Sequence, residues 1–208
     1  MENMLQTENI EEAKLVIASL KSAISYGEYR TLVADHVEQG TSTGPEQSEA
    51  LANYTVLSHA RMKRLDKTVK IPDTVARQFS KAKGNYTWVV LTESWCGDAA
   101  QSMPAMNQLA NLAPNIDLKV VLRDDNLDLM DAFLTNGSRS IPKLLVFDQD
   151  KQTVLQTWGP RPSVATEMVN AYKKEHGQLT PEFKKDLQVW YNKDKSQSII
   201  EDLTLLID

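Results

Sequence analysis

The fold is decided by the stretch YTWVVLTESWCGDAAQSMPAMNQLANL, residues 86–112. Its opening run, YTWVVLT (86–92), has the length of one strand and is rich in β-branched and aromatic residues. Residues 97–112 are expected to form a helix, and Cys96 lies at the junction between the two. The stretch therefore predicts a strand that leads into a helix, with a cysteine at the helix start.

The alternation of strand and helix continues toward the C-terminus. Further strands are predicted over 116–122, 143–148 and 153–158, and further helices over 126–136 and 163–175. Because Gln149 and Asp150 mark a tight turn, the last two strands are expected to form a hairpin. This order of elements predicts an α/β fold, in which a mixed sheet is flanked by helices on both faces.

Helices are also predicted at both ends of the chain. Residues 1–71 are expected to form an N-terminal helical extension, with a helix over 9–26 that ends at Gly27, a loop over 40–49 and a helix over 46–68. In the loop, Pro45 is placed in the first turn of the second helix, with Thr43 or Gly44 near its cap. A short helix follows within 72–83. Residues 177–208 are expected to form a C-terminal helical tail, in which Pro181 opens a helix and the end, SIIEDLTLLID, is apolar enough to dock or dimerise.

Charge and composition narrow the class of protein. The 208 residues include 23 Lys and Arg against 28 Asp and Glu, a formal net charge of −5, which argues against nucleic-acid binding. There is no apolar run long enough for a membrane helix, and the acidic first twenty residues do not resemble a secretory signal. We therefore expect a cytoplasmic protein. One segment, RMKRLDKTVK (61–70), is basic, and it is either a solvated helix end or an anion-binding strip.

The chain has a single cysteine, Cys96, which excludes an intrachain disulfide and a multi-cysteine metal site. His36, His59 and His176 show no metal-ligand spacing, so no metal is expected. At a helix start, free N–H groups and the helix dipole favour the thiolate and predict a lowered pKa for Cys96. The alternative is that Cys96 is a small buried apolar residue.

The residues around Cys96 carry a family resemblance. The run Trp95-Cys96-Gly97-Asp98-Ala99 resembles the Trp-Cys-Gly-x-Cys active-site motif of the thioredoxin family. Pro104 resembles the proline that kinks the family's active-site helix, Ser140-Ile141-Pro142 resembles its Ile-Pro segment with a cis peptide, and Gly159 lies in the loop that borders the family's groove. The resemblance implies a thioredoxin-like domain over 72–176, similar to a bacterial subgroup that has added N-terminal helices.

Two positions depart from that pattern. Ala99 stands where the family has its resolving cysteine, and Val90 stands where ordinary thioredoxins have a buried carboxylate. A dithiol–disulfide cycle within the chain is therefore excluded, because a mixed disulfide at Cys96 has no internal attacker. Asp98 suits the first turn of a helix, but its charge disfavours a nearby thiolate.

The remaining candidate residues border the expected groove. Trp95 is expected to pack beside the thiol, and a cis Pro142 would present the Ile141 backbone to an extended peptide. Arg139 and Arg161 either pair with a carboxylate of a thiol such as glutathione or are ordinary surface arginines.

Two functions follow from these residues. The first is monothiol exchange at Cys96 with a disulfide-bearing protein or a small thiol, which needs no bound cofactor beyond an external low-molecular-weight thiol. The second is a redox-inactive binding or adaptor module that uses the groove beside the cis proline.

Overall fold

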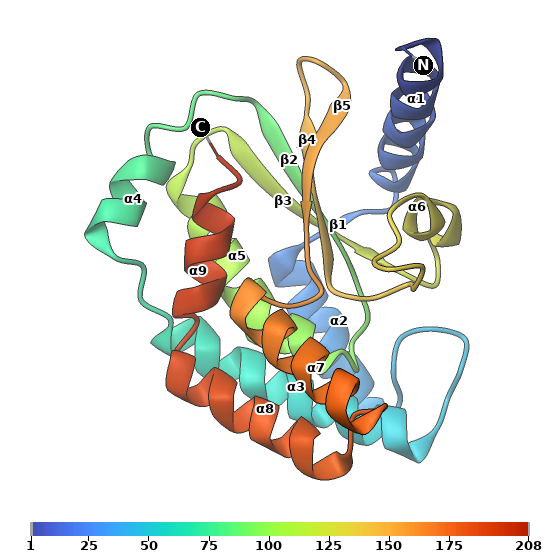
Figure 1. Ribbon diagram of the computed structural model, residues 1–208, viewed down its shortest axis with the longest axis vertical. Helices are drawn as coiled ribbons and strands as arrows, with labels where there is room; N and C mark the ends of the chain where they lie inside the picture. Colours follow the sequence, from blue (N-terminus) through green and yellow to red (C-terminus); the bar gives the residue numbers. More distant parts are fainter. Residues whose placement is uncertain (1, 208) are drawn as a thin grey trace.

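The computed structural model describes residues 2–207, with side chains from residue 9 onward (Figure 1). Within these residues one sheet has the strand order β1-β3-β2-β4-β5. Its strands are β1 (Ile24–Ser25), β2 (Tyr86–Thr92), β3 (Ile116–Leu122), β4 (Lys143–Asp148) and β5 (Thr153–Trp158). Strand β2 is parallel to β3 and antiparallel to β4, so the sheet is mixed. The predicted α/β class and the residues of β2 to β5 are confirmed.

The helices of the described residues cover both faces and one end of the sheet. They are α1 (Glu2–Ser19), α2 (Tyr26–Gln39), α3 (Glu49–Thr68), α4 (Asp73–Phe79), α5 (Gly97–Leu112), α6 (Leu127–Ala132), α7 (Ser163–His176), α8 (Pro181–Asp194) and α9 (Gln197–Thr204). In Figure 1, α1 and α6 lie on one side of the sheet, and α4, α5 and α9 lie on the other. None of these helices is both long and apolar enough to cross a membrane.

The core is built around β2, whose seven residues are all buried. A strand in the middle of a sheet with helices on both faces has no solvent side, which accounts for its largely apolar sequence. Trp88 packs edge-on against Phe79 of α4, with ring centroids 5.9 Å apart. The apolar tail packs on the same body, because Ile199, Ile200 and Leu203 of α9 are buried. This packing fixes β2, and with it the residues that follow β2.

The N-terminal elements differ from the prediction. The apolar pattern over 9–26 does not form one helix, because α1 ends at Ser19 and residues 24–25 form the edge strand β1. Helix α2 then begins at Tyr26 with a capping box, in which the Ser25 side chain and Glu28 bond each other's backbone N–H groups. The N-cap of α3 is Ser48, not Thr43 or Gly44, so Pro45 lies in the loop before that helix and not in its first turn. Helix α6 is also shorter than the predicted 126–136.

The loop before α3 is bonded to the end of β2. The Thr43 N–H donates to Ser94 Oγ at 2.9 Å, and the Ser94 N–H donates to Thr43 Oγ1 at 2.8 Å. Gly44 has a φ of +87°, and a Cβ at this position would lie 2.7 Å from a carboxylate oxygen of Asp124. The positive φ therefore favours a glycine at position 44, and a Cβ there would also displace the Asp124 carboxylate.

Candidate functional site

Cys96 is the N-cap residue of α5, as the sequence predicts. The Ala99 N–H donates to its Sγ at 3.4 Å, and the Sγ in turn donates to the carbonyl oxygen of Ile141 at 3.3 Å. The residue is only 6% exposed. The thiol therefore lies between the start of α5 and the segment that precedes β4.

That segment has the backbone conformation expected from the resemblance, because the Ile141–Pro142 peptide is cis. A second cis peptide, Gly159–Pro160, lies in the loop after β5 and was not predicted. Gly159 has a φ of +114°, and a Cβ there would lie 2.1 Å from the Pro142 carbonyl oxygen. The two loops thus approach each other so closely that only glycine fits at position 159.

The expected lowering of the Cys96 pKa is wrong. Burial of the thiol, followed by the nearby Asp98 carboxylate, raises its pKa to about 12. The N–H groups of Ala99 and Asp98 lower the pKa, as does Arg161, but these effects are smaller. The resting group is therefore a protonated thiol, because loss of solvation outweighs the field of the helix start.

Asp98 joins three segments that are far apart in the sequence. Its carboxylate lies 2.7 Å from a guanidinium nitrogen of Arg161 and accepts a hydrogen bond of 3.0 Å from the Tyr191 hydroxyl. The Asp98 side chain is 13% exposed, and burial raises its pKa although Arg161 and Tyr191 act in the opposite direction. Arg161 therefore binds a carboxylate of its own chain, and its Nε is buried with no partner among the described residues. Asp98 of α5 thus links this helix to the loop before α7 through Arg161 and to α8 through Tyr191.

Most of the predicted site residues border one cavity of about 800 Å³. We call this cavity the thiol groove, and the predicted residues that line it are Trp95, Cys96, Gly97, Asp98, Arg139, Ile141 and Arg161. Pro142, Ala99 and Pro104 do not line the thiol groove and are buried, the last two inside α5. The groove is completed by α8 and the turn before it, which contribute Leu179, Lys184, Lys185 and Leu187.

Trp95 and Arg139 are held by neighbours at the rim. The guanidinium of Arg123 lies over the Trp95 ring, 5.1 Å from its centroid. Arg139 binds both oxygens of Asp131 at 2.6 Å, in an exposed ion pair. Trp95 and Cys96 thus line the same groove, and Arg139 already has a carboxylate partner.

Sequence reasoning missed Glu93, which is 0% exposed and lies three residues before the cysteine. Its carboxylate accepts hydrogen bonds from the Thr43 hydroxyl and from the Asp124 N–H, and its carbonyl oxygen accepts one of 3.1 Å from the Tyr29 hydroxyl. Burial raises the pKa of Glu93. A carboxylate directly after a largely apolar strand was the available signal.

Arg61 and Tyr191 were also missed as site residues. Arg61, from the basic strip 61–70, lines the thiol groove, and Tyr191 binds Asp98 from α8. Only the three-dimensional arrangement brings α3 and α8 to the cysteine.

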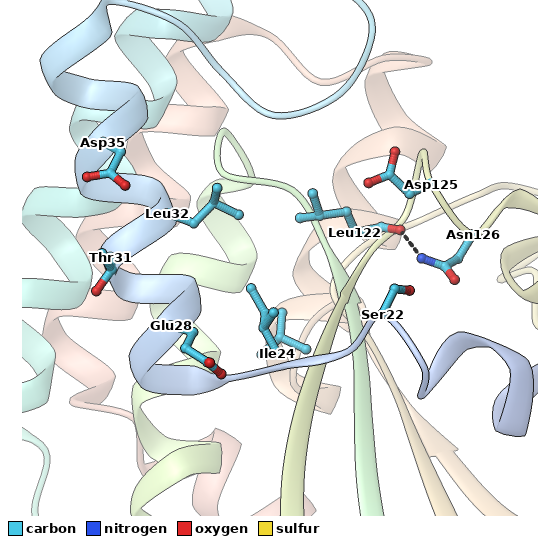
Figure 2. Close-up of a pocket in the computed structure, with 10 residues that line it drawn as sticks. Ser22, Ile24, Glu28, Thr31, Leu32, Asp35, Leu122, Asp125 and Asn126 are labelled. Carbon is cyan, nitrogen blue, oxygen red and sulfur yellow. Dashed lines mark hydrogen bonds between the residues drawn. The ribbon is translucent and has the colours of Figure 1, made fainter.

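A second cavity, of about 460 Å³, lies between α2 and the end of β3 (Figure 2). Its lining includes Glu28, Asp35 and Asp125, and the Asn126 side chain donates to the Leu122 carbonyl oxygen at 2.8 Å. None of the candidate residues named from the sequence borders it, so the thiol groove remains the candidate site.

Comparison with known proteins supports the fold described above. A family model described as thioredoxin matches residues 44–174. Two solved structures are similar: a Pseudomonas aeruginosa protein of unknown function (18% identity, TM-score 0.56) and an HIV epitope scaffold (17% identity, TM-score 0.55). Each match covers 88% of this chain and 96% of the other, and at these identities the likeness concerns the fold alone. No curated protein matches.

The segment that matches the family model is more than half of the chain and includes both Cys96 and the cis Ile141–Pro142 peptide. We conclude that the chain belongs to the thioredoxin family.

Proposed function

We propose that this protein is a thioredoxin-fold binding module, which holds a ligand in the thiol groove without redox turnover. The observation that carries this proposal is the enclosure of Cys96. Its Sγ is bonded to the Ile141 carbonyl oxygen, the residue is 6% exposed, and the position of a resolving thiol is held by the buried Ala99. A mixed disulfide at Cys96 would therefore have no attacker within the chain.

The size and lining of the thiol groove support binding. A cavity of about 800 Å³ is within the usual range of small-ligand sites, and it combines apolar walls with charged groups. Trp95, Ile141 and Leu187 provide apolar surface, and charged side chains surround them. This is the kind of lining that orients a ligand.

A second candidate function is monothiol exchange, which is favoured by the bond from the Ala99 N–H to Cys96 Sγ. In this reaction the thiol loses its proton, and the thiolate attacks a disulfide R–S–S–R. A new Cys96–S–S–R bond forms, and RSH leaves with the released proton. An external low-molecular-weight thiol R′SH then attacks the R sulfur of the mixed disulfide, so that R′–S–S–R forms, the Cys96–S bond breaks, and Cys96 leaves as the thiol with the proton of R′SH. A cytoplasmic location fits either function, since a reducing compartment keeps a lone thiol reduced.

The two functions are separated by challenge with a disulfide. The reduced protein is incubated with glutathione disulfide and analysed by intact mass, and insulin reduction is followed with excess dithiothreitol. The Cys96→Ser variant serves as the control. A binding module gives no mixed disulfide within an hour and no insulin reduction above the dithiothreitol rate. Rapid adduct formation at Cys96, with catalysis that the Cys96→Ser variant lacks, would replace this proposal with monothiol exchange.

A further inference from the structure

The thiol groove is strongly positive in a chain that is negative overall. Its described lining includes six cationic side chains and one anionic side chain, Asp98, although the whole chain has a net charge of −5. The six cations are Arg61, Arg123, Arg139, Arg161, Lys184 and Lys185. They come from α3, from the residues after β3, from the loops before β4 and α7, and from α8. Cations from five separate segments therefore converge on one cavity, which creates a field that attracts anions.

Three of these cations already have carboxylate partners. Arg161 binds Asp98, and Arg139 binds Asp131. Arg123 lies 2.7 Å from its chain neighbour Asp124. The other three, Arg61, Lys184 and Lys185, form no ion pair with a described residue. Their charge is available to a ligand.

Arg61 is the most informative of the three, because it is partly buried. Its guanidinium lies over Gly97, where an added Cβ would come within 3.1 Å of Nη1. Burial lowers the pKa of Arg61, and the field of Asp98 only partly opposes this effect. A guanidinium that loses solvation without an ion partner is destabilised, and an anion placed beside it offsets that cost.

We propose that the thiol groove binds a small molecule with at least two anionic groups, carboxylate or phosphate. Arg61 binds one group beside Gly97, and Lys184 with Lys185 of α8 binds another. The proposal rests on the proposed function, because it takes the groove as a ligand site. A small molecule fits better than a macromolecule, because the cations surround a cavity of about 800 Å³ and do not form a flat strip.

The test is calorimetric titration at low ionic strength, with citrate and pyrophosphate as separate probes for the carboxylate and phosphate classes. At least one probe should bind saturably, and its binding should weaken as salt is added. Arg61→Gln should weaken binding by about tenfold or more, because it removes a charge-assisted hydrogen bond. The double variant Lys184→Gln with Lys185→Gln should weaken it by several-fold. The matched controls are Lys67→Gln on α3 and Lys193→Gln on α8, two exposed lysines that do not line the groove.

Absence of saturable binding for both probes would overturn the inference. Equal weakening by the control variants would also overturn it, since the effect would then be that of net charge. The disulfide challenge is independent of these titrations. Anion binding together with Cys96 turnover would reject only the redox-inactive function, and an inert Cys96 without anion binding would reject only the anionic ligand. Turnover without anion binding would reject both.

Discussion

Replacing Asp98 with asparagine should make Cys96 more reactive. The pKa of Cys96 is about 12, against an ordinary 9.0, and each unit changes the thiolate population tenfold. At pH 8 the native thiol should therefore be alkylated roughly a thousandfold more slowly than the denatured chain. Asp98 is the second cause of this shift, after burial. A nearby like charge typically changes a pKa by about one unit or more, so Asp98→Asn should speed alkylation at pH 8 by about tenfold.

The variant should not reach the denatured rate, because burial of the thiol remains. Asparagine still offers an oxygen to the Tyr191 hydroxyl, and Arg161 is left as an uncompensated positive charge that favours the thiolate. The assay is iodoacetamide alkylation followed by intact mass from pH 7 to 11, with the denatured protein as reference. Circular dichroism verifies that each variant is folded.

The matched control is Asp131→Asn, which makes the same change in the exposed ion pair with Arg139. It should leave the alkylation rate of Cys96 within about twofold of the wild type, because an exposed charge is screened by solvent. A native rate equal to the denatured rate would refute the reasoning on burial. Equal effects of the two substitutions would refute the role of Asp98.

Three further predictions concern positions near the site. Ala99→Cys should form an intrachain disulfide with Cys96 under mild oxidation, since one helical turn separates the two residues. Intact mass and free-thiol titration measure the bond. Two free thiols that persist after oxidation would contradict the geometry. Glu93→Gln should reduce the loss of stability between pH 4 and 8, measured by urea unfolding. Burial raises the pKa of Glu93 in the folded state above its ordinary value of 4.5. The wild type therefore has the stability contributed by the protonated Glu93 in full below pH 4.5 and loses it as the pH rises through the pKa of the folded state. An identical pH dependence of the unfolding free energy in Glu93→Gln would contradict this role of Glu93. Gly44→Ala and the control Gly40→Ala should each lower the free energy of unfolding by about 1–2 kcal/mol, because both glycines have positive φ. The loss should be somewhat larger at position 44, where a Cβ would also displace the Asp124 carboxylate, and a smaller loss at position 44 than at position 40 would contradict this.

The central elements could be predicted because local and tertiary preferences agree there. The run over 86–92 is rich in β-branched and aromatic residues, and the strand it forms is buried throughout. The start of α5 at Gly97 and the cis Ile141–Pro142 peptide were likewise placed correctly. The strand and the helix start follow from a short stretch of sequence, whereas the cis peptide was expected only from the family resemblance.

The N-terminal misassignment has a physical cause. The apolar spacing over 9–26 is compatible with one continuous helix. It is equally compatible with the observed arrangement, in which α1 ends at Ser19 and residues 24–25 pair with β3. The pattern Ser25-x-x-Glu28 was a usable signal for the start of α2, because it is a capping box.

The state of the thiol could not be predicted, because it depends on contacts distant in sequence. A helix start lowers the pKa of a cysteine, but burial can raise it by more, and the sequence gives no measure of the burial of Cys96. Arg161 and Tyr191, the partners of Asp98, lie 63 and 93 residues beyond it and come together only in the folded chain. Side-chain neighbours of this kind require the structure.

The short strand β1 has a consequence for self-association. It pairs with Lys119 and Val120 of β3, and the first residues of that strand have no strand on this side within the described chain. An open strand edge can accept a strand from another molecule, and charged side chains oppose such pairing. Asp117 and Lys119 of β3 form an ion pair at 3.0 Å, in which the Asp117 side chain is exposed. Loss of residues 24–25 would uncover the whole length of β3, and this charged pair would then be the main barrier to edge-to-edge aggregation.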